Sequence, residues 1–377
     1  MNKLKLLFID FSLPFLLRDV DYPVGGWAVE LNSWIKGLCV NGHQVGVLTR
    51  RGANEYVGHS FDFDLIETFD PDQGIKILKY FYSYIPALYK NTKNFTPDVI
   101  IQACAMVTTG IMATISEMLK VPFVYRVAND MDTDKRYKKR LPKYAQISYR
   151  YGLKKADLIL CQNEYQYKQI KNDFPEKPAC LIPNPFAGEI WDSDSISSFE
   201  ARDYIAWLGI FSGQKNLTLL YDIARKLPEI PFKVAGKFGN NVGQNTHNIV
   251  EKLYSCSNVE FVGYLSREQV PIFLGQAKAL LSTSYYEGFS NTFLEAFSTG
   301  TPVIVPKNVD PSKIIYRYGL GYSIHTADLS EKIIELFKNE KQYATMSKRC
   351  IEYVKKNHSP KVLSKELIEI IINTLKQ

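Results

Sequence analysis

The stretch Glu287-Gly-Phe-Ser-Asn-Thr-Phe-Leu-Glu295 decides the fold and the site of this 377-residue chain. The largely apolar residues 279–286 precede it, and Gly300-Thr-Pro-Val-Ile-Val305 follows it. This order predicts a strand, a loop, a helix, a turn and a second strand. Ser290 fits the N-cap of the predicted helix, because its hydroxyl can accept from the first free backbone amides.

Two carboxylates therefore bracket the amino end of this helix. Glu287 lies in the loop before it and Glu295 about five residues inside it, which is roughly 7–8 Å along the axis at ~1.5 Å per residue. The free amides at a helix start favour a bound anion. A ligand with a phosphate in its middle and hydroxyls at both ends fits this arrangement, and a sugar nucleotide is such a molecule.

Composition limits the class of protein. The length predicts two domains. A net charge of +7 and a pI near 8.8 suit an anionic ligand or an anionic membrane surface, and do not by themselves indicate nucleic acid. The scattered cysteines and histidines predict free thiols in a reducing compartment and no structural zinc site. Residues 4–17 are interrupted by Asp10 and lack the pattern of a signal peptide, so we expect a cytoplasmic protein.

Short apolar runs alternate with amphipathic segments along the chain, which is typical of parallel βα units. Strands are expected at 4–9, 44–48, 99–102, 123–127, 158–161, 204–208, 232–235, 259–262, 279–282 and 302–305, and helices at 27–40, 109–119, 216–227, 269–274 and 291–298.

The polar residues 188–203 are interpreted as an interdomain linker. The expected domains are 1–190 and 191–359, and residues 360–377 form a tail helix that packs back on the N-terminal domain. Since ligands gather beyond the carboxyl ends of parallel strands, each half is expected to present loops to a cleft.

Two further segments indicate a bound anion. In Trp207-Leu-Gly-Ile-Phe-Ser-Gly-Gln-Lys215-Asn216, a strand ends at Gly209 and Lys215 stands at the start of a helix. Lysine prefers the other end of a helix, so a cation here suggests a shared anion; a solvated surface lysine is the alternative. The pair Gly25-Gly26 in Tyr22-Pro-Val-Gly-Gly-Trp27 permits close approach of backbone to a ligand; an ordinary turn is the alternative.

Taken together, these motifs resemble the retaining, sugar-nucleotide-dependent glycosyltransferases of family 4. The resemblance rests on Gly25-Gly26, on Gly209 with Lys215-Asn216, and on the E-x7-E block with its following Gly-Thr-Pro-Val; Ile182-Pro-Asn-Pro185 is similar to the family's Pro-Asn-Gly turn. It covers nearly the whole chain. It implies an α/β protein of the GT-B fold, with two Rossmann-like parallel-sheet domains facing a cleft. The N-terminal domain would bind the acceptor and the C-terminal domain a UDP- or GDP-linked sugar.

The resemblance also implies roles for individual residues. Glu295 is expected to bind the ribose hydroxyls, and Glu287 to face the transferred sugar near its reacting carbon. The ammonium of Lys215 is expected to hold the diphosphate, and Gly209 belongs to the same donor-binding set. The remaining donor-binding residues are expected to be Gly25 and Gly26, which close over the diphosphate, and Gly288, Phe289, Ser290 and Asn291, which offer backbone N–H groups.

The chain departs from the family pattern at two places. Members often carry Arg where this chain has Ile210, and His where it has Asn129. Asn cannot act as a general base, so Asp130 is the first choice if one is needed. The family's same-face mechanism lets the leaving phosphate accept the proton instead. No metal and no cofactor are expected; Asp130-Met-Asp132 is the nearest candidate for a metal ligand.

Two basic, aromatic segments remain. Residues 135–155 hold nine Lys or Arg, four Tyr and no acidic residue, and Lys76–Lys90 is a second such segment. They predict either a solvated face or a patch that rests on anionic lipid at the inner face of the cell membrane. The second reading would suit a lipid-linked acceptor. Nucleic acid is not expected, because no recognition motif accompanies the charge.

The expected function is therefore that of a retaining, metal-independent hexosyltransferase. Its acceptor would be a saccharide or a lipid-linked molecule, in cell-surface polysaccharide or glycolipid assembly. Two alternatives stay open. One is an epimerase or phosphorylase of the same fold, and the other is a non-catalytic nucleotide-sugar-binding protein, which Ile210 and Asn129 favour.

Overall fold

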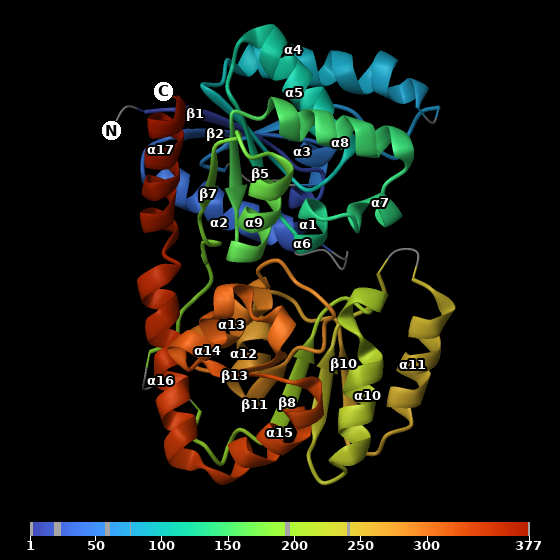
Figure 1. Ribbon diagram of the computed structural model, residues 1–377, viewed down its shortest axis with the longest axis vertical. Coiled ribbons are helices and arrows are strands. Elements are labelled where there is room, and N and C mark those ends of the chain that lie inside the picture. The colour runs from blue at the N-terminus through green and yellow to red at the C-terminus, as the bar shows by residue number, and fades with distance from the viewer. Residues whose placement is uncertain are drawn as a thin grey trace. The chain divides into compact units, whose positions relative to one another are not determined.

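The chain divides into two compact units in the computed structural model (Figure 1). The structure describes residues 3–18, 24–56, 61–75, 77–192, 197–239 and 242–375. The N-terminal unit comprises residues 1–187 and 359–377, and the C-terminal unit comprises residues 188–358.

The N-terminal unit is built on a parallel sheet with the strand order β3-β2-β1-β4-β5-β6-β7 in its described part. The strands are β1 (Lys5–Ile9), β2 (Gln44–Thr49), β3 (Asp64–Glu67), β4 (Val99–Ala103), β5 (Phe123–Arg126), β6 (Leu158–Cys161) and β7 (Ala179–Leu181). The helices are α1 (Leu13–Leu17), α2 (Gly26–Val40), α3 (Ala53–Tyr56), the π-helical turn η1 (Tyr80–Tyr84), α4 (Ile85–Phe95), α5 (Val107–Leu119), α6 (Asp130–Thr133), α7 (Tyr137–Arg140), α8 (Lys143–Lys155), α9 (Glu164–Asp173) and α17 (Pro360–Leu375).

Successive residues of these strands enter two separate hydrophobic cores. In β1, Leu6 and Phe8 pack with residues of α2 and α17, whereas Leu7 and Ile9 pack with residues of α5 and α8. Side chains alternate between the faces of a strand, so a strand that is covered on both faces is an uninterrupted apolar run.

The C-terminal unit repeats this plan with the described strand order β10-β9-β8-β11-β12-β13, again all parallel. Its strands are β8 (Tyr204–Leu208), β9 (Phe232–Ala235), β10 (Val259–Gly263), β11 (Ala277–Leu281), β12 (Val303–Pro306) and β13 (Gly321–Ile324). Its helices are the 3₁₀ turns η3 (Gly213–Lys215), η4 (Lys307–Val309), η5 (Pro311–Lys313) and η6 (Thr326–Asp328), and α10 (Leu217–Lys226), α11 (Gln244–Tyr254), α12 (Gln269–Gly275), α13 (Asn291–Ser298), α14 (Ile314–Tyr318), α15 (Leu329–Lys338) and α16 (Glu340–Asn357).

Most of the predicted elements are present. The strands at 158–161, 204–208 and 232–235 and the helix at 291–298 match residue for residue. The sequence did not predict β3, β7 and β13. Each of the three stands at the edge of its sheet, where a strand is covered less completely and its apolar pattern is weaker.

The segment 188–203, predicted as a linker, groups with the C-terminal unit. Arg202 anchors this segment there. Its fully buried guanidinium donates to the carbonyl of Thr299 and to the hydroxyl of Thr301, each at 2.8 Å. The polar composition of the segment hides this buried anchor.

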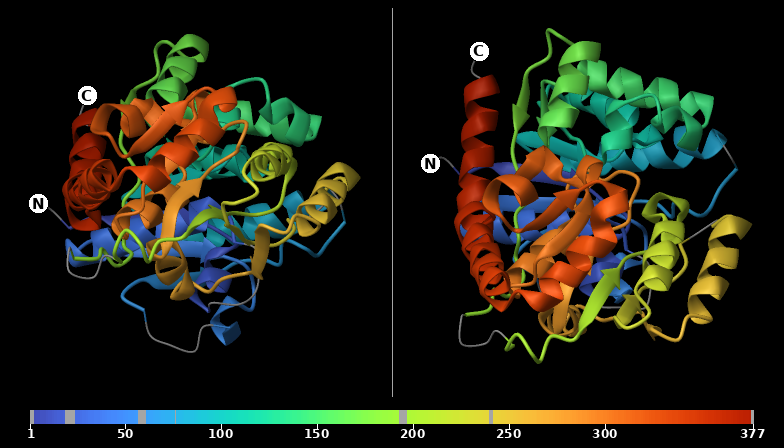
Figure 2. Two further views of the ribbon diagram at one scale, coloured as in Figure 1. Left: turned by 90° about the horizontal axis from the view of Figure 1, so that it is seen from below. Right: turned by 60° about the horizontal axis from the view of Figure 1, so that its bottom comes forward.

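The tail helix α17 packs against α2 in the N-terminal unit (red beside blue in Figures 1 and 2). Leu363, Leu367, Ile368 and Ile371 are buried in this contact. The two backbones approach closely at Gly37, where a Cβ would lie 2.2 Å from the carbonyl oxygen of Pro360. Within the described residues, no helix combines the length and apolar character needed to cross a bilayer.

We expect Gly37→Ala to destabilise the N-terminal unit, although alanine is the better helix former by about 1 kcal/mol. The added methyl would overlap the Pro360 carbonyl, and overpacking of this kind typically costs about 1–3 kcal/mol. Urea unfolding followed by circular dichroism measures the change. Lys36→Ala, at an exposed position of the same helix, is the matched control. A Gly37→Ala protein as stable as wild type would show that α17 does not press on α2 at this point.

Candidate active site

In the C-terminal unit, the order of the strands reverses at β8, which has β9 on one side and β11 on the other. Ligands of such sheets bind outside the carboxyl ends of the strands at this switch point. The loop after β8 passes through Gly209 and η3 to α10, and the loop after β11 covers residues 282–290 and leads into α13. Because β8 and β11 are parallel neighbours, both loops leave the same edge of the sheet.

The two loops join at an ion pair between Lys215 and Glu287. The Nζ of Lys215 lies 2.6 Å from Oε1 of Glu287, and the side chains are 21% and 9% exposed. The hydroxyl of Ser284 donates to the same carboxylate oxygen at 2.6 Å. Thr283 fixes the lysine backbone by donating to the carbonyl of Lys215 at 2.7 Å, and it accepts from the indole of Trp207 at 3.0 Å. A partly accessible cation is therefore held rigidly at the switch point.

The helix α13 begins at Asn291, and Ser290 is its N-cap, as predicted. The hydroxyl of Ser290 does not accept from the helix backbone; it pairs with the hydroxyl of Thr292 at 2.8 Å. The sequence therefore located the helix start correctly, but the expected side-chain cap is wrong. The start of α13 immediately follows the loop that carries Glu287.

Glu295 lies on the fifth residue of α13. Its pKa is raised from 4.5 to about 7, because desolvation outweighs the attraction of the Arg267 guanidinium. The residue as a whole is half-buried, so part of Glu295 still reaches solvent. A poorly hydrated carboxylate in this position would gain from ligand hydroxyls that donate to it.

The site departs from the family pattern at position 210, where members often carry Arg and this chain has Ile; Ile210 and Arg267 show what replaces that charge. Ile210 packs near Gly239, where a Cβ would lie 2.9 Å from the isoleucine Cγ2, so it fills space and offers no charge. Arg267, in the loop between β10 and α12, was missed by the sequence reasoning because no motif marks it. Its electrostatic effect on Glu295 makes it the candidate for the second cation.

Gly209 lies against the lysine of the site. A Cβ on Gly209 would meet Cε of Lys215 at 3.4 Å, which is ordinary contact. Gly236 faces it from the end of β9 with a φ of +145°, and a Cβ there would lie 1.9 Å from the carbonyl oxygen of Gly209. The close backbone contact and the positive φ therefore require glycine at position 236. At position 209, by contrast, a Cβ would make only ordinary contacts.

The other predicted site residues belong to the N-terminal unit. Gly25 is the N-cap of α2 and Gly26 its first residue, while Tyr22 and Pro23 lie outside the described residues. A Cβ on Gly25 would meet nothing within 4 Å. The fold itself therefore does not require a glycine at position 25.

Asn129 and Asp130 follow β5 and are used by the fold. Asn129 caps α6, and its Oδ1 accepts from the amide of Met131 at 3.1 Å. Asp130 is buried, and its Oδ1 accepts from the side-chain amides of Asn163 at 2.9 Å and Gln166 at 3.1 Å. A carboxylate held in this way is poorly placed to act as a base.

The pair Asp130 and Asp132 does not fit a metal. Asp132 accepts from Arg140 at 2.9 Å, and burial raises its pKa to about 6. Each carboxylate thus faces a nitrogen donor, not an open position. Among the described residues, no three His, Cys, Asp or Glu side chains gather at one point where they could hold a metal ion.

A buried polar network joins α2 to the end of β5 and to the segments that follow β6 and β7. Arg126 donates to Glu30 at 2.9 Å, to the carbonyl of Ile182 at 2.7 Å and to Oδ1 of Asn184 at 2.8 Å. Glu30 also accepts from Gln162 at 2.8 Å. The Asn184 of the family-like turn therefore completes a core network in the N-terminal unit.

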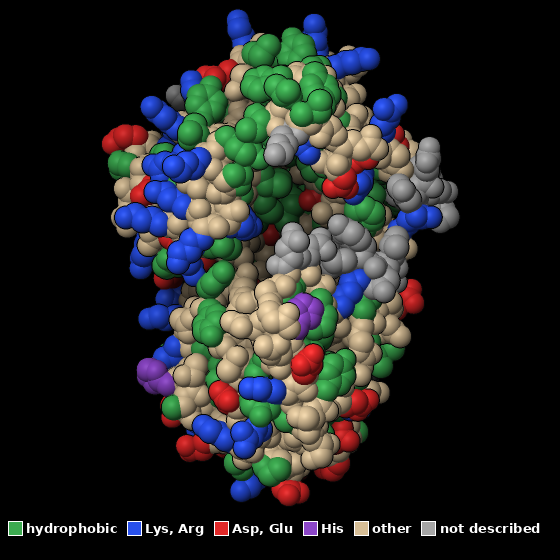
Figure 3. Space-filling view, turned by 90° about the vertical axis from the view of Figure 1, so that its right-hand side faces the viewer, with side chains coloured by type: hydrophobic (Ala, Val, Ile, Leu, Met, Phe, Trp, Pro, Cys, Tyr) green, Lys and Arg blue, Asp and Glu red, His purple; other side chains and the backbone are tan. Residues whose placement is uncertain are grey.

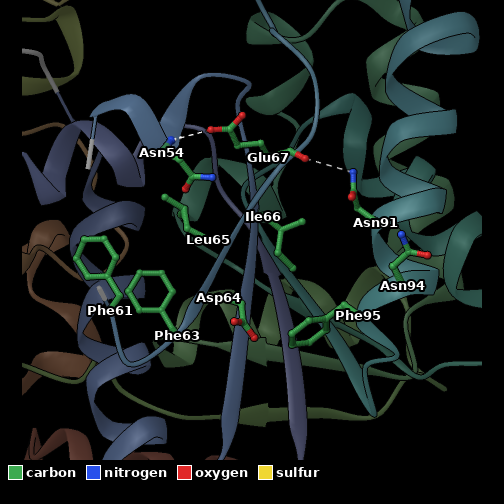
Figure 4. A pocket seen from close by; sticks show the side chains of 10 residues that line it. All are labelled: Asn54, Phe61, Phe63, Asp64, Leu65, Ile66, Glu67, Asn91, Asn94 and Phe95. Atoms are coloured by element: carbon green, nitrogen blue, oxygen red, sulfur yellow. Dashed lines mark hydrogen bonds between the residues drawn. The ribbon is translucent and has the colours of Figure 1, made fainter. Parts of the chain in front are cut away.

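A cavity of about 610 Å³ opens at the edge strand β3 (Figure 4). Aromatic, amide and acidic side chains line it, among them Phe61, Phe63 and Asn91. The carboxylate of Glu67 accepts from the backbone amides of Gly52 at 3.1 Å and Asn54 at 2.7 Å. Glu67 therefore holds the loop between β2 and α3 in place. The cavity itself lies away from the switch point of its sheet, which is at β1.

Comparisons with known proteins agree with this architecture. The family model described as "Glycosyltransferase Family 4" matches residues 24–187, and the one described as "Glycosyl transferases group 1" matches residues 191–357. An uncharacterized glycosyltransferase, MJ1178, of Methanocaldococcus jannaschii is 26% identical over 211 residues, which are 55% of this chain. The match spans only 57% of that relative's length.

Solved structures show the same fold. Sucrose-phosphate synthase (tll1590) from Thermosynechococcus elongatus has a TM-score of 0.78 at 14% identity, covering 99% of this chain and 100% of that one. Anabaena Alr3699/HepE in complex with UDP and glucose has a TM-score of 0.74 at 15% identity, covering 98% and 99%. The fold is therefore GT-B, with two Rossmann-like parallel-sheet domains, which confirms the predicted fold class.

The raised pKa of Glu295 predicts how the stability of the ligand-free protein depends on pH. The folded pKa of about 7 exceeds the ordinary value of 4.5, so this carboxyl favours the fold below pH 4.5 and loses that effect as pH rises through about 7. Glu295→Gln should therefore raise the melting temperature more at pH 8 than at pH 5. Glu251→Gln, on an exposed side chain of α11, is the matched control. A Glu295→Gln effect that is equal at both pH values would contradict this assignment.

Proposed function

Because this chain belongs to glycosyltransferase family 4, we propose that it moves a sugar from a nucleotide-sugar donor to an acceptor hydroxyl, with retention at the anomeric carbon. The observation that carries the proposal is the Lys215–Glu287 ion pair at the switch point, directly before the start of α13. It combines a cation for a leaving diphosphate with a carboxylate for the sugar.

The charges of the site match those that develop during transfer. The acceptor oxygen forms a bond to the anomeric carbon while the bond from that carbon to the phosphate breaks. Negative charge builds on the diphosphate, where the Lys215 ammonium and backbone N–H groups of residues 288–291 stabilise it. Positive charge builds on the sugar, which faces the Glu287 carboxylate.

Donor binding would rearrange the ion pair. In the ligand-free protein, Lys215 is bound to Glu287 at hydrogen-bond distance. A diphosphate competes for the same ammonium and carries more charge than the carboxylate. As the lysine turns to the phosphate, Glu287 becomes available to the hydroxyls of the sugar.

The ribose is proposed to lie at Glu295. Hydroxyls that donate to a carboxylate stabilise its charged form and oppose the desolvation that raises its pKa to about 7. Because HepE, which has the same fold, was solved with UDP and glucose, a UDP-sugar is the first donor to test, with GDP-sugars second.

The acceptor proton is proposed to go to an oxygen of the leaving phosphate. Asp130 accepts from two side-chain amides and Asn129 caps a helix, so neither is free to act as a base. The same-face mechanism needs none. We propose a saccharide or a lipid-linked saccharide as the acceptor, without a metal ion.

Two substitutions test the donor site. Glu295→Ala should weaken donor binding by roughly 10–100-fold, because about 1.5–3 kcal/mol of hydrogen bonding to a charged group is lost. Lys215→Ala should lower the transfer rate by roughly 10²–10³-fold, as for loss of one transition-state donor. Thermal-shift screening against UDP- and GDP-sugars finds the donor, and calorimetry and product analysis then measure binding and turnover.

Lys252→Ala, at an exposed position of α11, is the control for the loss of a positive charge. If both site variants behaved like wild type, the assignment of the site would fail. Donor binding without turnover across a panel of acceptors would instead favour a non-catalytic nucleotide-sugar-binding protein, which the apolar packing of Ile210 makes the second candidate. An epimerised donor sugar would indicate an epimerase.

A further inference from the structure

Two neighbouring segments of the N-terminal unit expose large apolar side chains. The first leads into and through η1, and Phe81 is 67% exposed there. The second is α8, where Ile147 is 72% exposed. We call the following side chains the apolar surface: Ile75, Ile77, Leu78, Phe81 and Tyr82 from the first segment, and Tyr144, Ile147 and Tyr151 from α8.

The stripe on α8 is only partly explained by contacts within the chain: the hydroxyl of Tyr151 donates to Glu117 at 2.8 Å and the ring of Tyr144 lies near that of Tyr80, but Ile147 is largely exposed. Tyr144, Ile147 and Tyr151 are spaced by three and four residues, so they share one face of the helix. The buried face is formed by other residues, including Tyr149 and Leu153, and packs on α5. A surface helix needs only one apolar face for its own core, so the second marks an interaction site.

The two segments form one continuous surface. The rings of Tyr80 and Tyr144 have centroids 6.1 Å apart and join the η1 segment to α8. Figure 3 shows hydrophobic side chains gathered at the top of the view, with several Lys and Arg and a few Asp or Glu side chains around them. Two hydrogen bonds tie the η1 segment to the loop before it: the hydroxyl of Tyr82 accepts from the amide of Ile75 at 3.0 Å, and Tyr84 donates to the carbonyl of Pro71 at 2.8 Å.

Positive charge surrounds this surface. Residues 76–95 and 135–155 contain no Asp or Glu. The margin carries exposed lysines and arginines, among them Lys90, Lys93, Lys138, Lys139, Lys143 and Lys154. The nearby carboxylates are paired: Glu117 with Lys155 at 2.5 Å, Asp173 with Arg150 at 3.1 Å, and Asp70 and Asp72, next to the η1 segment, with Arg50 at 3.4 and 2.7 Å.

We propose that the apolar surface docks on a bilayer that contains anionic lipid. The aliphatic side chains and Phe81 would enter the boundary between head groups and acyl chains, where the amphipathic rings of Tyr82, Tyr144 and Tyr151 also fit. The surrounding lysines would attract the lipid phosphates. An anionic membrane suits this combination of apolar side chains, tyrosines and unopposed cations better than a protein partner.

Vesicle co-sedimentation of the full chain tests the proposal, with phosphatidylcholine vesicles that contain or lack phosphatidylglycerol. Wild type should bind the anionic vesicles selectively and more weakly at high salt. The double variant Phe81→Ser/Ile147→Ser should bind them at least about tenfold more weakly, because two exposed apolar side chains no longer enter the interface. Lys143→Glu/Lys154→Glu should also weaken binding and should reduce its salt dependence.

Ile272→Ser is the matched control, because Ile272 is an exposed isoleucine of α12 in the C-terminal unit. It should bind vesicles like wild type. Every variant should keep its melting temperature and its nucleotide-sugar binding, so this test is separate from that of the donor site. Binding that ignores phosphatidylglycerol, or that both double variants retain, would overturn the proposal. So would a wild-type dimer in light scattering that Phe81→Ser/Ile147→Ser converts to a monomer without loss of vesicle binding.

Discussion

The ion pair between Lys215 and Glu287 is the interaction on which the candidate site depends. It links the loops of two adjacent parallel strands, β8 and β11, at the point where the strand order reverses. Neither charged group is fully buried. Each can therefore leave the ion pair for another partner without remaining as an unpaired charge in the protein interior. Complete burial would make the same pair costly to break, typically by several kcal/mol. Partial exposure would let Lys215 and Glu287 exchange this contact for the proposed donor.

Glu295 shows the opposite arrangement. Desolvation outweighs the attraction of the Arg267 guanidinium and holds the pKa of this carboxyl at about 7. A protein selected for stability alone would place an apolar side chain at this position of α13. A charged group that destabilises the ligand-free protein, and whose charge ligand hydroxyls would stabilise, is typical of binding sites. The site therefore combines a carboxylate that is held in an ion pair, Glu287, with one whose charged form is disfavoured by burial, Glu295.

Local patterns made much of this structure predictable. The strand at 204–208 and the helix at 291–298 could be read from short stretches, because apolar runs and the Gly-Phe-Ser-Asn turn carry the signal within a few residues. Arg267 could not be found, since its relation to Glu295 exists only after α12 and α13 have packed together. The same holds for Arg126 and Glu30, which are 96 positions apart and form one bonded unit inside the fold.

That buried unit has a consequence for altering the protein. Its hydrogen bonds run from Glu30 in α2 through Gln162 and Gln166 to Asp130, and so tie the helix that begins at Gly26 to the loop after β5. Removing any one member would leave a polar or charged group without a partner in a water-free interior. Random mutagenesis should therefore yield few folded variants with changes in this set, and libraries that aim to alter the proposed acceptor binding are better directed at the solvent-facing residues around it.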